Sequence, residues 1–170
     1  MTSEQAKFLA EFFANVLEQE GRTTAQVLAA VTEEGRDYKP DAKSRSAWEL
    51  ASHLAAGDIW FLDSICDGAF NWDPDAEKRV TAGFRNVSDV VEFYNRELPK
   101  RVQRIRSAPP EQMARVIDFF GMMQQPAAAF LSIAVNHGVH HRGQLAAYLR
   151  PLGSRVPSIY GGSADTEAAT

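Results

Sequence analysis

The sequence NHGVHHRGQLAAYL, from Asn136 to Leu149, contains three of the four histidines in the chain. On an α-helix, His137 and His141 are one turn apart, so their imidazoles project from one face with Cβ atoms roughly 6 Å apart. Two histidines at this spacing are typical of a helix that binds a metal ion. Because two imidazoles leave a divalent ion short of ligands, a third must come from elsewhere, and His53 is the remaining histidine.

The residues on either side of this stretch predict a helix over residues 126–150. Pro126 suits the first helical turn, and Pro151 and Gly153 follow the last one. Between them apolar residues recur every three or four positions, and both histidines of the one-turn pair fall on the apolar stripe. The pair is therefore expected to face the core.

A second helix is expected to begin at Ser46, because Ser46-Ala-Trp-Glu49 has the capping-box pattern. The spacing of the following apolar residues places His53 on the core-facing side, and Gly68 marks the end of the helix. Gly57, one turn after His53, is expected to leave open space beside the imidazole, with Trp60 as a wall. An open coordination position beside this glycine would indicate a catalytic site.

Apolar stripes also predict a helix over residues 2–34, ended by Gly35, and another over residues 88–107, capped by Ser88. Residues 67–86 are rich in glycine, aspartate, asparagine and proline. They are expected to form a long loop with room for a short helical turn, and long loops in compact domains are often functional.

Four helices without a convincing sheet predict an all-α fold, a four-helix bundle. Residues 113–123 show too little periodicity for an assignment, although RVIDFF has the character of a short extended piece. The bundle is expected to span residues 1–152. Residues 153–170 would form a partly flexible C-terminal extension whose few apolar side chains can fold back on the bundle.

The composition fits one domain and excludes several classes of protein. The chain has 170 residues, and its formal charge of −4 comes with basic residues spread along the sequence, so nucleic acid is not expected as a partner. Cys66 is the single cysteine, which suits a reducing compartment, and the cytoplasm is the expected location. The acidic, amphipathic start is unlike a signal peptide, and no membrane-spanning segment is predicted.

If the second and fourth helices face each other across the core, His53, His137 and His141 supply three nitrogen ligands to one ion. Three neutral imidazoles with water or substrate make a catalytic zinc arrangement, and imidazole also suits nickel, iron and copper. His140 is interpreted as a supporting or surface residue, with replacement of His141 as the alternative. The simpler interpretation is that these histidines are buried hydrogen-bonding residues without a metal.

These residues carry a resemblance to a known family. The stretch WELASHLAAGDIWFL around His53, together with NHGVHHRGQLAAYLR, resembles the DinB/YfiT-like superfamily of metal-dependent bacterial proteins. The match covers about residues 5–150, and the run from His141 to Gln144 is its most specific part. One departure is visible at Gly138, where family members often have an acidic residue.

The resemblance implies a dimeric four-helix bundle with a divalent ion, zinc or nickel, held by His53, His137 and His141. Some relatives are similar in fold to thiol-dependent S-transferases and to a mycothiol-dependent maleylpyruvate isomerase. A low-molecular-weight thiol and a small electrophilic substrate are therefore the expected partners, together with a second copy of the chain.

Three other residues near the histidines have both a functional and a structural interpretation. Gln144 can orient a bound water or hydrogen-bond a neighbouring helix. Arg142 can bind an anionic substrate, although an ion pair with an acidic side chain is favoured. Cys66 is expected to be an inert core residue and not a reactive thiol. No protein general base is evident near the histidines, which favours a nucleophile generated by the metal.

Two classes of function remain open. The first is a metal-dependent enzyme, a thiol-dependent S-transferase or a hydrolase, in which an ion with an open position activates a thiol or water. The second is a noncatalytic, stress-linked binding or assembly module in which the metal ties two helices together. A fourth protein ligand that closes the site would favour the second class.

Overall fold

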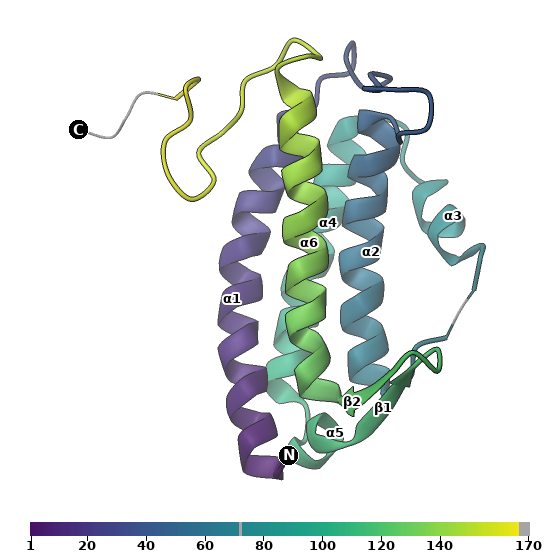
Figure 1. Cartoon of the computed structure of the whole chain (residues 1–170), viewed down its shortest axis with the longest axis vertical. Coiled ribbons are helices and arrows are strands. Elements are labelled where there is room, and N and C mark those ends of the chain that lie inside the picture. Colours follow the sequence, from purple (N-terminus) through teal and green to yellow (C-terminus); the bar gives the residue numbers. More distant parts are fainter. Residues whose placement is uncertain (72, 167–170) are drawn as a thin grey trace.

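The computed structural model describes residues 1–71 and 73–166, and it consists mainly of four long helices (Figure 1). These are α1 (Ser3–Ala29), α2 (Ala47–Asp67), α4 (Val87–Ser107) and α6 (Ala127–Leu149). The helices α1 and α2 each contact both α4 and α6, so α1 and α2 lie diagonally across the bundle. The predicted four-helix bundle is confirmed, and α2 and α6 are neighbours in it.

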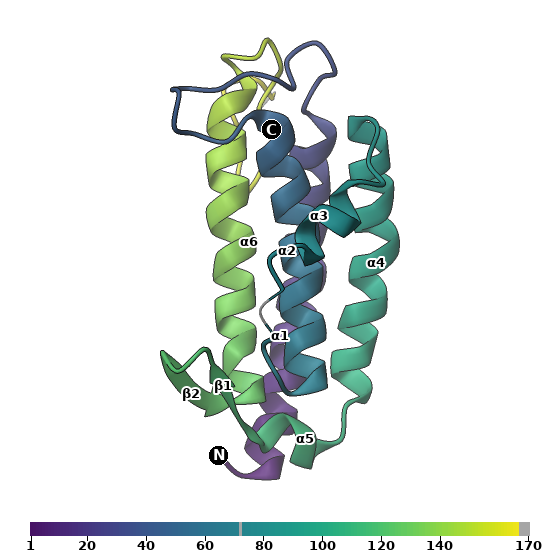
Figure 2. The ribbon, with the colours of Figure 1, turned by 90° about the vertical axis from the view of Figure 1, so that its right-hand side faces the viewer.

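The segment that connects α2 to α4 runs along the length of the bundle. In Figures 1 and 2, α1 and α6 run upward while α2 and α4 run downward. The connection from α2 to α4 must therefore return along the whole bundle, as in bundles with a long crossover. It contains the short helix α3 (Ala76–Thr81), which packs against α2 and corresponds to the helical turn that the sequence allowed in this loop.

A second group of short elements closes the lower end of the bundle before α6. It comprises α5 (Pro110–Ala114) and a two-stranded antiparallel sheet of β1 (Val116–Phe119) and β2 (Met123–Pro126). Phe120 and Gly121, at the turn, both have positive φ, 55° and 73°. The extended character of RVIDFF is thus correct, but its partner strand has no periodic signal in the sequence.

Both ends of α2 are as the sequence predicts. The Glu49 N–H donates to Ser46 Oγ at 3.1 Å, and the Ser46 N–H donates to Glu49 Oε2 at 2.7 Å, which completes the capping box. The helix ends at Gly68, whose φ of 72° lies in the left-handed region that favours glycine. These two caps fix where His53 stands along the bundle axis.

The end predicted for the first helix is wrong by about one turn. The helix α1 stops at Ala29, and the chain then turns before it reaches Gly35. The Gly35 N–H donates to Thr32 Oγ1 at 3.1 Å, so a threonine side chain takes the place of a helical backbone acceptor.

The cap predicted for the third long helix is also wrong. Asn86 caps α4, because its side-chain oxygen accepts from the Asp89 N–H at 2.8 Å. Ser88 lies inside the first turn, is exposed, and pairs with Glu92 at 3.4 Å.

The two serines give a matched test of these assignments. Ser46→Ala is expected to lower the free energy of unfolding by about 1 kcal/mol, because it removes one half of the capping box. Ser88→Ala is expected to change it by less than about 0.5 kcal/mol, as for most surface substitutions. Urea unfolding followed by circular dichroism measures both. A larger loss for Ser88→Ala than for Ser46→Ala would contradict the caps described above.

The core lies between the four long helices and continues into the tail. Its large, fully buried apolar side chains include Phe130, Leu54, Leu62, Ile65, Ile105 and Leu145. In the described part of the tail, Val156 and Ile159 pack on this core, so apolar tail residues do fold back on the bundle. Among residues 1–71 and 73–166, no helix is both long and apolar enough to cross a bilayer.

Candidate metal centre

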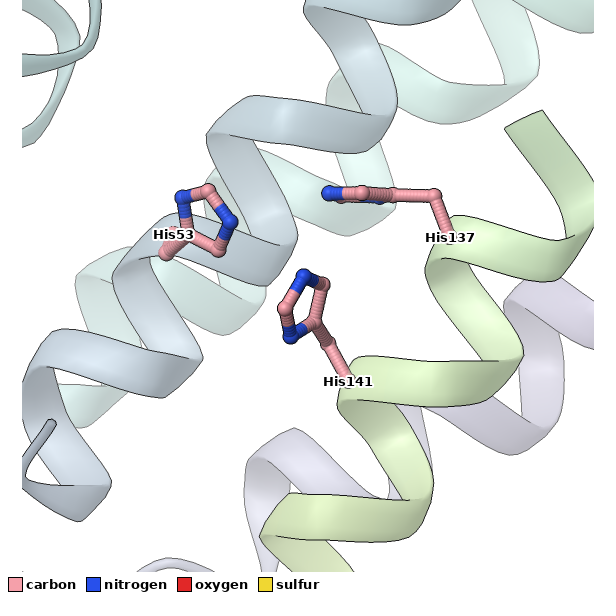
Figure 3. A group of neighbouring side chains, drawn as sticks. All are labelled: His53, His137 and His141. Carbon is pink, nitrogen blue, oxygen red and sulfur yellow. The ribbon is translucent and has the colours of Figure 1, made fainter. Parts of the chain in front are cut away.

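Three imidazole rings from two neighbouring helices converge on one point of the bundle (Figure 3). His53 comes from α2, and His137 and His141 come from α6. One ring nitrogen from each lies within 4.8 Å of those of the other two, and all three residues are partly buried. His140 is exposed and does not belong to this group. The structure thus brings together the three histidines that the sequence analysis selects.

Each of the three rings is oriented by an oxygen acceptor at Nδ1. His53 Nδ1 lies 3.0 Å from Glu77 Oε2, and His137 Nδ1 lies 3.0 Å from Asp58 Oδ1. His141 Nδ1 lies 2.8 Å from the side-chain oxygen of its neighbour one turn on, Gln144. An ionised carboxylate or an amide oxygen can only accept, so each Nδ1 is the donor and each Nε2 is left for another partner.

The electrostatics of the site keep two of the imidazoles, those of His53 and His141, neutral. Burial is the main cause that lowers the pKa of His53, and it lowers the pKa of His141 to about 4. Both rings are therefore uncharged at pH 7, which is the form that binds metals. Metal-binding histidines usually bond an outer acceptor through the second ring nitrogen, and all three Nδ1 atoms here have such a partner. The donor set thus fits a divalent ion.

Asp58 connects the site to the opposite side of the core. It is 8% exposed, and its second oxygen accepts from the Tyr94 hydroxyl of α4 at 3.0 Å. Burial, followed by the charge of Asp58, raises the pKa of Tyr94, so the phenol stays a donor. Since both carboxylate oxygens of Asp58 are bonded, the carboxylate is held in place and in turn fixes the orientation of His137.

Two glycines make room for these side chains where α2 and α6 meet. A Cβ atom at Gly57 would lie 2.7 Å from His137 Cε1, and one at Gly138 would lie 3.1 Å from Asp58 Oδ2. The space beside Gly57 is therefore filled by an imidazole, and the expectation of open space there is wrong. Gly138 lacks the acidic side chain that the resemblance implies, and the Asp58 carboxylate of α2 lies against that position.

Neither of the two carboxylates that contact the histidines was predicted from the sequence. Asp58 could have been identified, because apart from His53 it is the one ionisable residue in the apolar stretch from Leu50 to Leu62. An acid in such a stretch must find a partner when it is buried. Glu77 could not be identified from the sequence, because it belongs to a polar segment whose position depends on how the connection between α2 and α4 packs. No protein general base was evident near the histidines from the sequence, but two carboxylates contact their Nδ1 atoms.

Changing Asp58 tests the outer hydrogen bonds without touching a candidate ligand. Asp58→Asn is expected to weaken zinc binding by roughly 10- to 100-fold, because it removes the charge that orients His137. Asp63→Asn, on the same helix but paired with Arg101 at 3.0 Å, is the control and should bind as the unchanged protein does. Competition with a chromophoric chelator measures the affinity. Equal affinities for the two variants would contradict the role given to Asp58.

The other polar residues named from the sequence have structural roles. Arg142 is 1% exposed and pairs with Glu20 of α1 at 2.6 Å, so the favoured ion pair is observed. Gln144 bonds His141, not a neighbouring helix. Cys66 is buried, and burial raises the pKa of its thiol to about 11, which agrees with an inert core residue.

Two bacterial proteins are similar to this chain in sequence. The uncharacterized protein YjoA of Bacillus subtilis is 26% identical over 139 residues, which are 81% of this chain and 86% of that protein. YrdA of the same organism, also uncharacterized, is 26% identical over 152 residues, 89% of this chain and 87% of that protein.

Two crystal structures have the same architecture. That of YjoA, a DinB-like protein, superimposes with a TM-score of 0.67 at 24% identity, and covers 84% of this chain and 92% of its own. A DinB-like protein from Bacillus cereus has a TM-score of 0.69 at 21% identity, and covers 87% of this chain and 95% of its own. The family model for the DinB family matches residues 3–169, and the chain therefore belongs to the DinB family.

Proposed function

We propose that this protein is a metal-dependent enzyme in which His53, His137 and His141 hold one divalent ion, zinc or nickel. The observation that supports it is the donor set: three partly buried imidazoles with bonded Nδ1 atoms. Among residues 1–71 and 73–166, no fourth histidine, cysteine or carboxylate joins this group. Three protein ligands leave a position for substrate or water, as in catalytic zinc sites.

The reaction that fits best is transfer to or from a low-molecular-weight thiol, with hydrolysis as the second possibility. A divalent ion bound there would lower the pKa of a thiol or of water and would polarise a carbonyl. The thiol must come from a cosubstrate, because Cys66 is the single cysteine and is buried and protonated at pH 7. Glu77 is 45% exposed, so its carboxylate can accept a proton from the solvent side of the site.

A turnover experiment separates the enzyme from a noncatalytic module. Untagged protein loaded with zinc or nickel would be assayed with small thiols and a chromogenic electrophile, and with a nitrophenyl ester for hydrolysis. We expect a rate that requires metal, disappears in His141→Ala and persists in His140→Ala. Stoichiometric metal in the unchanged protein, with only the background rate in all three proteins, would favour the alternative, a binding or assembly module whose metal ties α2 to α6.

We also propose a homodimer, and the outer face of α1 offers a surface for it. Phe8 is 70% exposed and Phe12 is 52% exposed, one turn apart on the same face. Exposed apolar patches of this kind often mark protein interfaces. Light scattering is expected to give twice the mass of the chain for the unchanged protein and a monomer for the Phe8→Glu/Phe12→Glu double variant. A monomer before any change would contradict the dimer.

A further inference from the structure

An open surface cavity of about 650 Å³ lies beside His53, between the loop that precedes α2, the first turns of α2, and α3. Its volume is in the range of small-molecule sites, roughly 300–1,000 Å³. None of the three histidines lines this cavity. Glu77 connects it to the candidate metal centre, because its carboxylate lines the cavity and accepts a hydrogen bond from His53. Ser52, adjacent to His53 in the chain, also lines it. A molecule in the cavity therefore borders the candidate metal centre.

The walls of this cavity are more basic than acidic, in a chain whose formal charge is −4. The charged residues of the lining are Lys39, Lys43, Arg45, Lys78, Glu49 and Glu77. Lys39 pairs with Glu49, and Lys78 pairs with Asp75, both at 3.1 Å. Within the described part of the chain, Lys43 and Arg45 take part in no ion pair. Two unpaired cations at the wall of a concave site favour an anionic ligand.

The strongest indication of a ligand is the hydroxyl of Ser52. The residue is 4% exposed and lines the cavity, yet its Oγ has no hydrogen-bond partner among residues 1–71 and 73–166. Buried polar groups are nearly always bonded, because an unpaired hydroxyl costs free energy. A ligand oxygen in the cavity would supply the missing acceptor.

Arg45 adds a group that suits such a ligand. A guanidinium can pair bidentately with a carboxylate or phosphate. Because Glu77 lines the cavity and lies 3.0 Å from His53 Nδ1, an anion bound in the cavity borders the candidate metal centre.

We propose that this cavity binds the anionic group, a carboxylate or phosphate, of a small-molecule substrate whose reacting atom lies at the three histidines. Arg45 and Lys43 supply the countercharge, and the Ser52 hydroxyl donates to an oxygen of the anion. The assignment of the occupant as a substrate rests on the proposed function. The anion site itself does not, since it involves none of the three histidines.

The test uses the full chain without metal, so that anions cannot bind to an ion instead. Inorganic phosphate and succinate would be titrated separately and followed by amide NMR and calorimetry. We expect saturable binding that shifts the amides around Ser52 and Arg45, and the relative affinities tell phosphate from carboxylate recognition. Arg45→Gln is expected to weaken binding about tenfold, and Arg45→Lys is expected to retain part of it.

Two further variants complete the design. Ser52→Ala is expected to weaken binding about threefold while the thermal midpoint stays unchanged or rises, because the hydroxyl has no partner to lose. Arg155→Gln, which removes an exposed charge that does not line the cavity, should bind as the unchanged protein does. No saturable binding of either anion, or equal affinity in the Arg45→Gln and Ser52→Ala variants and the unchanged protein, would overturn the proposal.

Metal titration of the same samples keeps this inference separate from the proposed function. Anion binding without any metal binding would leave the anion site standing and remove the enzyme proposal. Metal binding without anion binding would remove the anion site alone.

Discussion

Replacing His53, His137 or His141 by alanine is expected to reduce the metal content from near one ion per chain to near zero. Each change removes one of three nitrogen ligands, and the loss should exceed the roughly 10- to 100-fold that follows the loss of an outer hydrogen-bond partner. Elemental mass spectrometry on untagged protein, purified without chelators and reconstituted with zinc or nickel, measures the content.

His140→Ala is the matched control for these variants. His140 lies beside His141 on α6, with ring centroids 4.9 Å apart, but it is exposed and stands outside the three-histidine group. Its removal should leave the metal content unchanged. Stoichiometric metal in the His141→Ala protein would show that the ligand assignment is wrong. Absence of metal from the unchanged protein even after reconstitution would mean that the three rings are buried hydrogen-bonding groups.

Glu20→Ala is expected to destabilise the protein by about 3 kcal/mol, because it removes the acidic partner of the buried Arg142 and leaves that charge behind. The Arg142 guanidinium, 1% exposed, donates to Glu20 Oε2 at 2.6 Å and to the Tyr160 hydroxyl at 2.5 Å. Tyr160 in turn donates to the same carboxylate at 2.8 Å. For a chain of this size the thermal midpoint should fall by about 6–12 °C.

Glu18→Ala provides the comparison on the same helix. Its carboxylate is 46% exposed and pairs with Arg22 and Arg106, so its loss should cost less than about 1 kcal/mol. Calorimetry measures the thermal midpoint and the loss of stability for both variants. If Glu20→Ala is no more destabilising than Glu18→Ala, the Arg142 pair does not hold the tail and α1 to α6. The Glu20→Ala/Arg142→Leu double variant should recover part of the loss, because it no longer buries an unpaired charge.

The sequence was sufficient to predict the bundle because each long helix has an apolar stripe with a period close to that of the α-helix. The same periodicity placed His53 and the His137–His141 pair on core-facing sides, and the structure brings them together between α2 and α6. The Ser46 capping box fixed the start of α2. These features depend on residues within one or two turns of each other, which a single sequence displays directly.

What the sequence could not predict depends on contacts between distant segments. The position of Glu77 beside His53 depends on how the crossover returns along α2, and no local pattern encodes that path. The filling of the space at Gly57 depends on the axial register of α6 against α2, which a helical period leaves undetermined. Asp58 was visible as an isolated acid, but its partners, His137 and Tyr94, come from two other helices.

The division of the three histidines between α2 and α6 has a consequence for the order of folding during synthesis. A nascent chain that has produced only α1 to α4 carries a single histidine of the site, and α6 alone carries two. A three-nitrogen site therefore exists only after the last helix has docked on the first three. An ion that binds this site would stabilise the completed bundle by mass action, and it would slow the detachment of α6. Metal loading would thus follow folding and would protect only chains that have finished it.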